Sequence, residues 1–136
     1  MFDLSTRILV VDDMMTMRKI VAKVCKEIGF TDITEAQDGA LGWQSITDAK
    51  PGYGIIISDW NMPNCTGLDL LKRVRSDSRF STLPFLLVTA ESEQHQIVEA
   101  VKAGVCGYVI KPFNTDSLKA QLEAAHQKFL AAAKAA

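Results

Sequence analysis

Short apolar runs alternate with helical patterns about five times along this 136-residue chain, and no other feature constrains the fold as strongly. Residues 7–11 and 55–58 are the clearest runs, apolar almost throughout and rich in β-branched residues. Such runs are typical of strands that are covered on both faces. Strands that alternate with helices pair in parallel, because each connection has to cross over the sheet. The sequence therefore predicts an α/β fold: a doubly wound parallel sheet with helices on both faces.

Local signals set the expected boundaries of these elements. Strands are expected at residues 7–11, 31–35, 55–58, 83–89 and 107–110, and helices at 17–28, 39–48, 66–74, 92–103 and 114–129. Thr66 and Asp69 have the spacing of a capping box, and Asn114 is the expected cap of the last helix. The run at 31–35 is the weakest strand pattern, which favours a place at the edge of the sheet.

Several apolar side chains are expected to pack inside the molecule. In the helix at 92–103, Ile97, Val98 and Val101 share a helical spacing that predicts burial. Met14 and Met15 follow the first strand and are expected to fill gaps between neighbouring elements.

Composition excludes several classes of protein. Fifteen basic and sixteen acidic side chains give a net charge of −1, which argues against a nucleic-acid-binding protein with a broad basic surface. The apolar runs are too short to span a bilayer, and the first residues lack a signal-peptide pattern. The three cysteines are widely spaced, so no disulfide framework is expected. We expect one cytoplasmic, monomeric domain over residues 1–136, with its core at about 7–130.

Polar residues with complementary charges follow the four strongest strands. The carboxyl ends of these strands carry, in turn, Asp12 and Asp13, Asp59, Thr89 and Lys111. In parallel sheets the carboxyl ends of the strands share one rim, and ligands bind there. Carboxylates a few ångströms apart repel one another by about 4 kcal/mol per pair at an effective dielectric near 20. A fold tolerates this repulsion only if a cation offsets it or if the carboxyl groups stay partly protonated. Mg²⁺ suits such a site, and the rim then has the groups that phosphoryl transfer requires.

Taken singly, each of these residues has a simpler explanation. Asp13, for example, stands where an aspartate can cap the helix that follows. The coincidence of complementary groups at four strand ends is what favours a functional site.

Four segments together resemble the response-regulator receiver domain, and within that family the single-domain regulators of chemotaxis. The segments are Asp12-Asp13, Asp59-Trp60-Asn61-Met62-Pro63, Thr89-Ala90-Glu91 and Tyr108-Val109-Ile110-Lys111-Pro112-Phe113. The resemblance extends from about Arg7 to about Phe129. It implies the flavodoxin-like strand order 2-1-3-4-5 and a cis peptide bond between Lys111 and Pro112.

The resemblance also implies a chemistry. Asp59 would accept a phosphoryl group from a phosphohistidine of a chemotaxis-type sensor histidine kinase. Asp13, Asp59 and the backbone carbonyl of Asn61 would bind Mg²⁺, and Asp12 would act partly through water. Lys111 would pair with a phosphoryl oxygen. The chain would catalyse only its own phosphoryl transfer and dephosphorylation, so it is not expected to be an enzyme in the usual sense.

Signalling would follow from the added charge. Thr89 would turn to bond a phosphoryl oxygen, and Tyr108 would follow it inward. This change would bias a surface made by the fourth helix, the last strand and the last helix. Asn61 and Glu91 would flank the water that hydrolyses the acyl phosphate, which implies a short-lived signal.

The expected output surface departs from its relatives. Gln94, Gln121 and Ala124 stand where motor-binding relatives carry lysine, and the loss of those charges weakens attraction to an acidic segment of the flagellar motor switch. Ser92 and Ile97 keep part of the surface. The motor switch is the expected partner, and a phosphate sink or a different protein partner is the alternative. A dedicated phosphatase is a further candidate partner.

Two proteins of other classes share parts of this pattern. A haloacid-dehalogenase-type phosphatase also uses an aspartate after a strand, but it needs a second aspartate two residues later, where this chain has Asn61. A flavodoxin-like electron carrier binds its flavin phosphate in a first loop rich in hydroxyl groups and glycine. Here that loop begins with Asp12 and Asp13, which would repel a phosphate.

Overall fold

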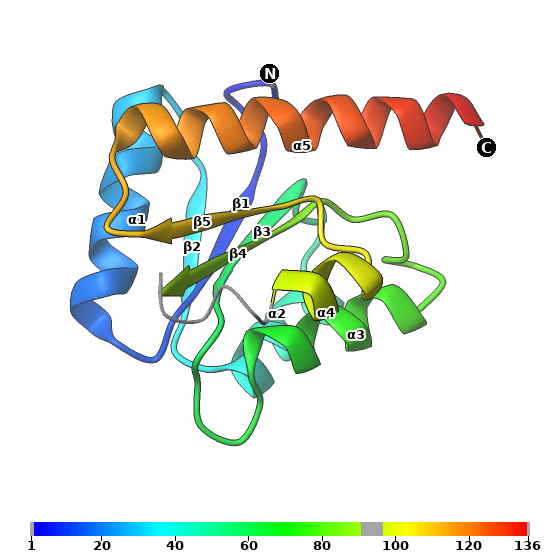
Figure 1. Ribbon diagram of the computed structural model, residues 1–136, viewed down its shortest axis with the longest axis horizontal. Helices are drawn as coiled ribbons and strands as arrows, with labels where there is room; N and C mark the ends of the chain where they lie inside the picture. Colours follow the sequence, from blue (N-terminus) through cyan, green and yellow to red (C-terminus); the bar gives the residue numbers. More distant parts are fainter. Residues whose placement is uncertain (1, 91–96, 136) are drawn as a thin grey trace.

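A single five-stranded sheet organises the molecule (Figure 1). The computed structural model describes residues 2–90 and 97–135, with side chains described as far as residue 131. All four strand pairs are parallel, and the order across the sheet is β2-β1-β3-β4-β5. The predicted α/β class and the strand order 2-1-3-4-5 are therefore confirmed.

Strands and helices alternate along the part of the chain that the structure describes. The strands are β1 (Ile8–Val11), β2 (Ile33–Ala36), β3 (Ile55–Asp59), β4 (Phe85–Ala90) and β5 (Gly107–Lys111). The helices are α1 (Met15–Ile28), α2 (Gly39–Asp48), α3 (Gly67–Ser76), α4 (Ile97–Lys102) and α5 (Thr115–Ala135). In the described residues, no helix is both long and apolar enough to cross a membrane.

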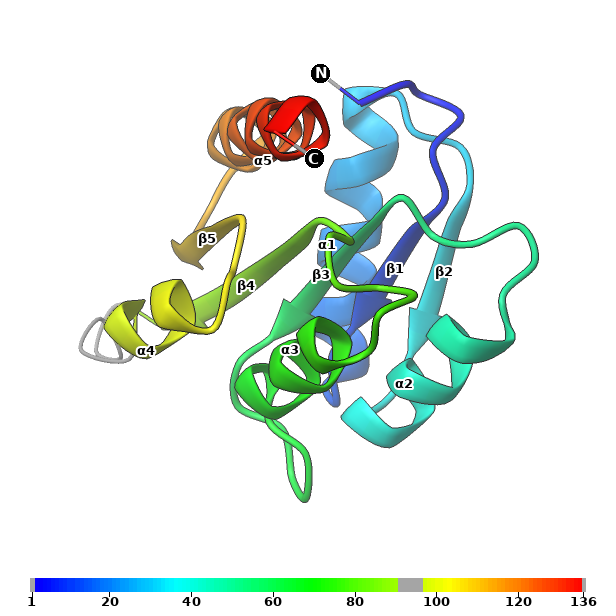
Figure 2. The same ribbon diagram turned by 90° about the vertical axis from the view of Figure 1, so that its right-hand side faces the viewer.

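Helices cover both faces of the sheet, which explains the apolar character of the central strands. One face packs against α1 and α5 and the other against α2, α3 and α4 (Figure 2). In β1, Ile8 and Val10 belong to the first cluster, while Leu9 and Val11 belong to the second. Successive side chains of a strand point to opposite faces, so each position of β1 has to be apolar. β2 lies at an edge of the sheet, as its weak pattern indicated.

Two helix starts are formed by the residues that the sequence singled out. Thr66 and Asp69 form a complete capping box at the start of α3, with both reciprocal hydrogen bonds present. The Oδ1 atom of Asn114 accepts a 2.8 Å hydrogen bond from the backbone N–H of Ser117 at the start of α5. These caps satisfy backbone groups that the first turn of a helix leaves unpaired.

Some packing predictions were wrong. Val98 and Val101 of α4 are 59% and 61% exposed, and Ala100 is the buried residue of that helix. A helical spacing of apolar residues does not say which face meets the core, and in α4 the small side chain occupies that face. Met14 and Met15 are 56% and 64% exposed. Met14 is the N-cap of α1 and Met15 its first residue, so they lie at the N-terminal end of the helix rather than between neighbouring elements.

Candidate functional site

The carboxyl ends of the central strands bring the predicted residues together. β1 and β3 are neighbours, with Val11 opposite Ser58, so Asp12 and Asp59 each lie one residue further along on adjacent strands. In the next pair, β4 and β5, Ala90 is opposite Lys111. Residues separated by up to about a hundred positions in sequence therefore meet at one rim of the sheet.

Three carboxylates cluster at this rim. One oxygen each from Asp12, Asp13 and Asp59 can be chosen so that all three lie within 4.8 Å of one another. Asp12 and Asp59 are only 2% and 6% exposed, whereas Asp13 is exposed. The cluster thus has two acids set into the protein and one at its mouth, open to solvent.

Lys111 is paired with one of the buried acids. Its Nζ atom donates a 3.0 Å hydrogen bond to Oδ1 of Asp59, and the pair is shielded, with side-chain exposures of 28% and 7%. The peptide bond that follows Lys111 is cis, as predicted. One ammonium group next to three carboxyl groups leaves the rim with an excess of negative charge.

Burial is the main cause of the raised pKa values of the two buried acids. The pKa of Asp12 is raised to about 6, mainly by burial and to a smaller extent by the charges of Asp59 and Asp13. A hydrogen bond from the Met14 backbone N–H and the charge of Lys111 act in the opposite direction. Burial also raises the pKa of Asp59, although the hydrogen bond from Lys111 acts in the opposite direction. Ionising the two buried acids, Asp12 and Asp59, is therefore unfavourable in the protein alone.

Thr89 lies beside the cluster but does not bond it. Its side chain is buried in β4, and its hydroxyl donates to the backbone carbonyl of Ala90 over a long 3.4 Å. Tyr108 is half-buried on the neighbouring strand β5, opposite Leu87. Thr89 thus stands between the acids and the β5 edge of the sheet.

A family comparison identifies this arrangement. The model of the response regulator receiver domain matches residues 8–123, which is most of the chain. The chain belongs to the response-regulator receiver family. Receiver domains of this kind are signalling proteins rather than classical enzymes.

Relatives of this receiver domain act in chemotaxis. It is 44% identical over 117 residues to the chemotaxis protein CheY1 of Helicobacter pylori, covering 86% of this chain and 94% of that protein. It is 45% identical over 117 residues to the chemotaxis protein CheY of Pseudomonas aeruginosa, covering 86% and 93%. Among solved structures, the chemotaxis response regulator CheY4 of Vibrio cholerae superposes with a TM-score of 0.79 at 30% identity, covering 89% of this chain and 98% of that one. The receiver domain is therefore of the CheY type.

The acidic rim of this receiver fits a Mg²⁺ ion. All three clustered side chains offer oxygen atoms, the donors that Mg²⁺ prefers, and two of them have an ionised form that burial makes costly. A divalent cation would offset the charge that Lys111 leaves uncompensated. Asn61, expected to add its carbonyl oxygen, is exposed in the loop directly after β3.

Two of the predicted output residues lie on helices rather than at the strand ends that carry the acids. Ile97 is half-buried at the start of α4, and Gln121 is half-buried on α5. The Oε1 atom of Gln121 lies over Gly107 of β5, since a Cβ at Gly107 would be 2.7 Å from it. These contacts connect α5 to β5. Glu91, Ser92 and Gln94 lie outside the described residues.

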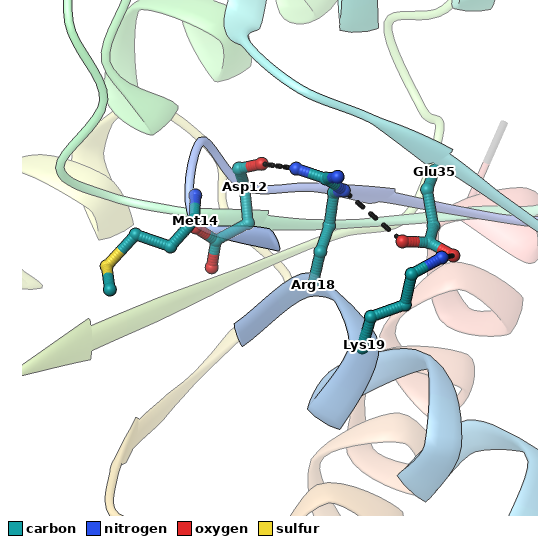
Figure 3. A network of polar contacts seen from close by, with 5 residues as sticks. All are labelled: Asp12, Met14, Arg18, Lys19 and Glu35. Atoms are coloured by element: carbon teal, nitrogen blue, oxygen red, sulfur yellow. Dashed lines mark hydrogen bonds and ion pairs between the residues drawn. The ribbon is translucent and has the colours of Figure 1, made fainter. Parts of the chain in front are cut away.

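Sequence reasoning missed a polar network behind the rim. Arg18 and Lys19 of α1 and Glu35 of β2 form ion pairs, and Arg18 also reaches Asp12 (Figure 3). Arg18 is only 7% exposed. A signal was present: α1 buries residues 18, 21, 22 and 25, so an arginine occupies a position of the apolar face.

Proposed function

We propose that this receiver domain, over residues 1–136 with its core at about 7–130, is the phosphoacceptor switch of a chemotaxis two-component system. Asp59 accepts a phosphoryl group from the phosphohistidine of a sensor histidine kinase. The main support is the position of Asp59: a buried carboxylate held at 3.0 Å by Lys111 and flanked by two further acids. The CheY relatives support chemotaxis as the setting.

The transfer needs a nucleophile and charge stabilisation. A carboxylate oxygen of Asp59 attacks the phosphorus, the P–N bond to the imidazole breaks, and the bond electrons leave with the histidine, so that an acyl phosphate forms. Lys111 then donates to a phosphoryl oxygen and offsets its charge. Asp12, Asp13 and Asp59, together with the backbone carbonyl of Asn61, hold Mg²⁺, which when bound neutralises charge on the transferring group.

Phosphorylation is then converted into a change of surface. A phosphoryl group adds roughly 1.5 to 2 negative charges and strong acceptors next to Thr89. Because the bond from the Thr89 hydroxyl to Ala90 is long, little is lost when that hydroxyl turns toward a phosphoryl oxygen. Tyr108, half-buried on the adjacent strand, follows into the space that this movement leaves. The equilibrium between two forms of the α4–β5–α5 surface shifts accordingly.

The signal is short-lived and returns the domain to its resting form. Asn61 and Glu91 flank the water that hydrolyses the acyl phosphate of Asp59. A dedicated phosphatase is a candidate partner at the same site. The domain acts in the cytoplasm as a monomer and binds neither nucleic acid nor membrane.

The output partner is a protein that reads the α4–β5–α5 surface. The flagellar motor switch is the first candidate, because the relatives are chemotaxis CheY proteins. The surface itself favours the alternative, in which the domain drains phosphate from the kinase or binds a partner other than the motor switch. Val98 and Val101 expose apolar side chains there, and Gln121 and Ala124 carry no charge.

Fluorescence of Trp60 gives a direct test. Trp60 is buried and adjacent to Asp59, so acetyl phosphate with Mg²⁺ is expected to change its emission. The experiment uses the Trp43→Phe variant, which lacks the other tryptophan. It compares this protein with the double variant that also carries Asp59→Asn. The same response in the Asp59→Asn protein would contradict the assignment of the nucleophile. Binding of a motor-switch peptide, with and without phosphorylation, distinguishes the two output candidates.

A further inference from the structure

Arg18 connects the acidic rim to strand β2. Its Nη1 atom donates a 3.0 Å hydrogen bond to the backbone carbonyl of Asp12, and its Nε atom donates a 3.2 Å bond to Oε1 of Glu35 (Figure 3). The planar guanidinium makes both contacts at once, which a lysine ammonium on a flexible stem does less well. A nearly buried arginine is thus satisfied by a backbone oxygen on one side and a carboxylate on the other.

Asp12 is held at three points, and Arg18 provides one of them. The Asp12 backbone N–H donates to the Ala36 carbonyl at 3.1 Å, and Oδ1 of Asp12 accepts from the Met14 backbone N–H at 2.9 Å. Helix α1 has no side-chain hydrogen bond at its N-cap, Met14, so this carboxylate also supports the start of the helix. With its carbonyl released, Asp12 would keep only the two contacts to Ala36 and Met14, and its carboxylate would be less well fixed.

Lys19 provides a comparison within the same network. It donates a 2.9 Å hydrogen bond to Oε2 of Glu35, whereas Arg18 bonds Oε1 of the same carboxylate. Both residues carry one positive charge. Lys19 is 63% exposed and Arg18 only 9% at the side chain. Of the two, only Arg18 contacts Asp12. If only the positive charge matters, replacing either residue should change the metal affinity. If the geometry of Asp12 matters, only the replacement of Arg18 should change it.

We propose that Arg18 is a positioning residue of the Mg²⁺ site, which fixes the Asp12 carboxylate in a geometry that selects Mg²⁺ over larger cations. The inference rests on the proposed function, since it concerns the same acids. Mg²⁺ requires nearly ideal octahedral geometry at about 2.0–2.1 Å, whereas Ca²⁺ accepts longer and more variable contacts. Loosening Asp12 therefore weakens Mg²⁺ binding more than Ca²⁺ binding.

The test compares Arg18→Met with Lys19→Met in the full chain. Protein freed of metal with a chelator is titrated calorimetrically with MgCl₂ and, separately, with CaCl₂ at pH 7.5. Arg18→Met is expected to weaken Mg²⁺ binding about tenfold, in the range seen when a supporting partner of a metal ligand is removed. Its Ca²⁺ affinity falls by a smaller factor, and Lys19→Met leaves both affinities close to those of the unaltered protein.

Three results would overturn the proposal: an unchanged Mg²⁺ affinity in Arg18→Met, an equal loss in Lys19→Met, or equal losses for Mg²⁺ and Ca²⁺. If Arg18→Met does not fold, Arg18→Lys replaces it, because it keeps the charge and the stem but has no planar fork. A wild-type Mg²⁺ affinity in Arg18→Lys then refutes the proposal. If the unaltered protein itself binds no Mg²⁺, the metal site of the proposed function fails as well, which separates that outcome from the others.

Discussion

Replacing Asp12 with asparagine is expected to stabilise the metal-free protein at neutral pH, although Asp12 belongs to the site. Burial, with smaller contributions from the charges of Asp59 and Asp13, raises the pKa of Asp12 from 3.8 to about 6. An acid whose pKa is higher in the folded than in the unfolded protein lowers the free energy of unfolding wherever it is ionised in both states. At 1.36 kcal/mol per pKa unit, the gain from removing this charge is at most about 3 kcal/mol.

The gain depends on pH with a definite sign. It is full above about pH 6, where the Asp12 carboxylate is charged in both states, and it declines as the pH falls toward about 4, where the unfolded chain also takes up the proton. Asparagine keeps an oxygen that can accept from the Met14 N–H, so that contact survives the substitution. The substituted protein therefore differs from the original chiefly in charge.

Urea unfolding in EDTA at pH 7.5 and at pH 4.5 measures this effect. Asp12→Asn is expected to raise the free energy of unfolding by about 1–3 kcal/mol at pH 7.5 and by less at pH 4.5. The control is Asp116→Asn, an exposed acid in the first turn of α5, with an expected change below ~1 kcal/mol. Adding Mg²⁺ stabilises the original protein much more than Asp12→Asn. A less stable Asp12→Asn protein in EDTA at pH 7.5, or a difference independent of pH, would refute the reasoning.

Three further substitutions have expected effects that urea unfolding in EDTA can measure. Lys111→Met leaves the Asp59 carboxylate buried without its ammonium partner, and it is expected to lower the free energy of unfolding by about 1–3 kcal/mol. Adding Asp59→Asn to this variant is expected to recover most of the loss. No recovery would show that Lys111 stabilises the protein by packing. Gly67→Ala is expected to cost about 1–3 kcal/mol, because a Cβ there would overlap the backbone carbonyl oxygen of Asp59; an unchanged midpoint would show that α3 can shift. Arg75→Met removes hydrogen bonds to the carbonyl oxygens of Leu83 and Gly104, and is expected to cost about 1–3 kcal/mol; a neutral result would mean that water replaces the guanidinium at both oxygens.

Much of the fold could be predicted because local chemistry and global packing agree. Strands covered on both faces have to be apolar at every position, and β1 is. The caps Thr66 and Asn114 bond their own helix starts, so they can be read without knowing the tertiary structure. The rim residues could be predicted because parallel strands place all their carboxyl ends at one edge of the sheet.

Other features depend on information that a sequence pattern lacks. The apolar residues of α4 have a helical spacing, but only the packing shows that Ala100 faces the core while Val98 and Val101 face solvent. Arginine side chains are usually exposed. Arg18 is buried because it has two hydrogen-bond partners on other parts of the chain, Glu35 and the backbone carbonyl of Asp12. The helical spacing of Arg18 with Val21 and Cys25 signals that it is buried, but the sequence does not show which partners it bonds.

The assignment of Asp59 as the phosphoacceptor is tested most directly by chemical trapping. The protein is phosphorylated with acetyl phosphate and Mg²⁺, the acyl phosphate is reduced with borohydride, and the modified residue is located by peptide mass spectrometry. Reduction at Asp59 alone, abolished by EDTA, is the predicted result. Modification at Asp12 or Asp13 in place of Asp59, or labelling of Asp59 that proceeds equally well in EDTA, would contradict it.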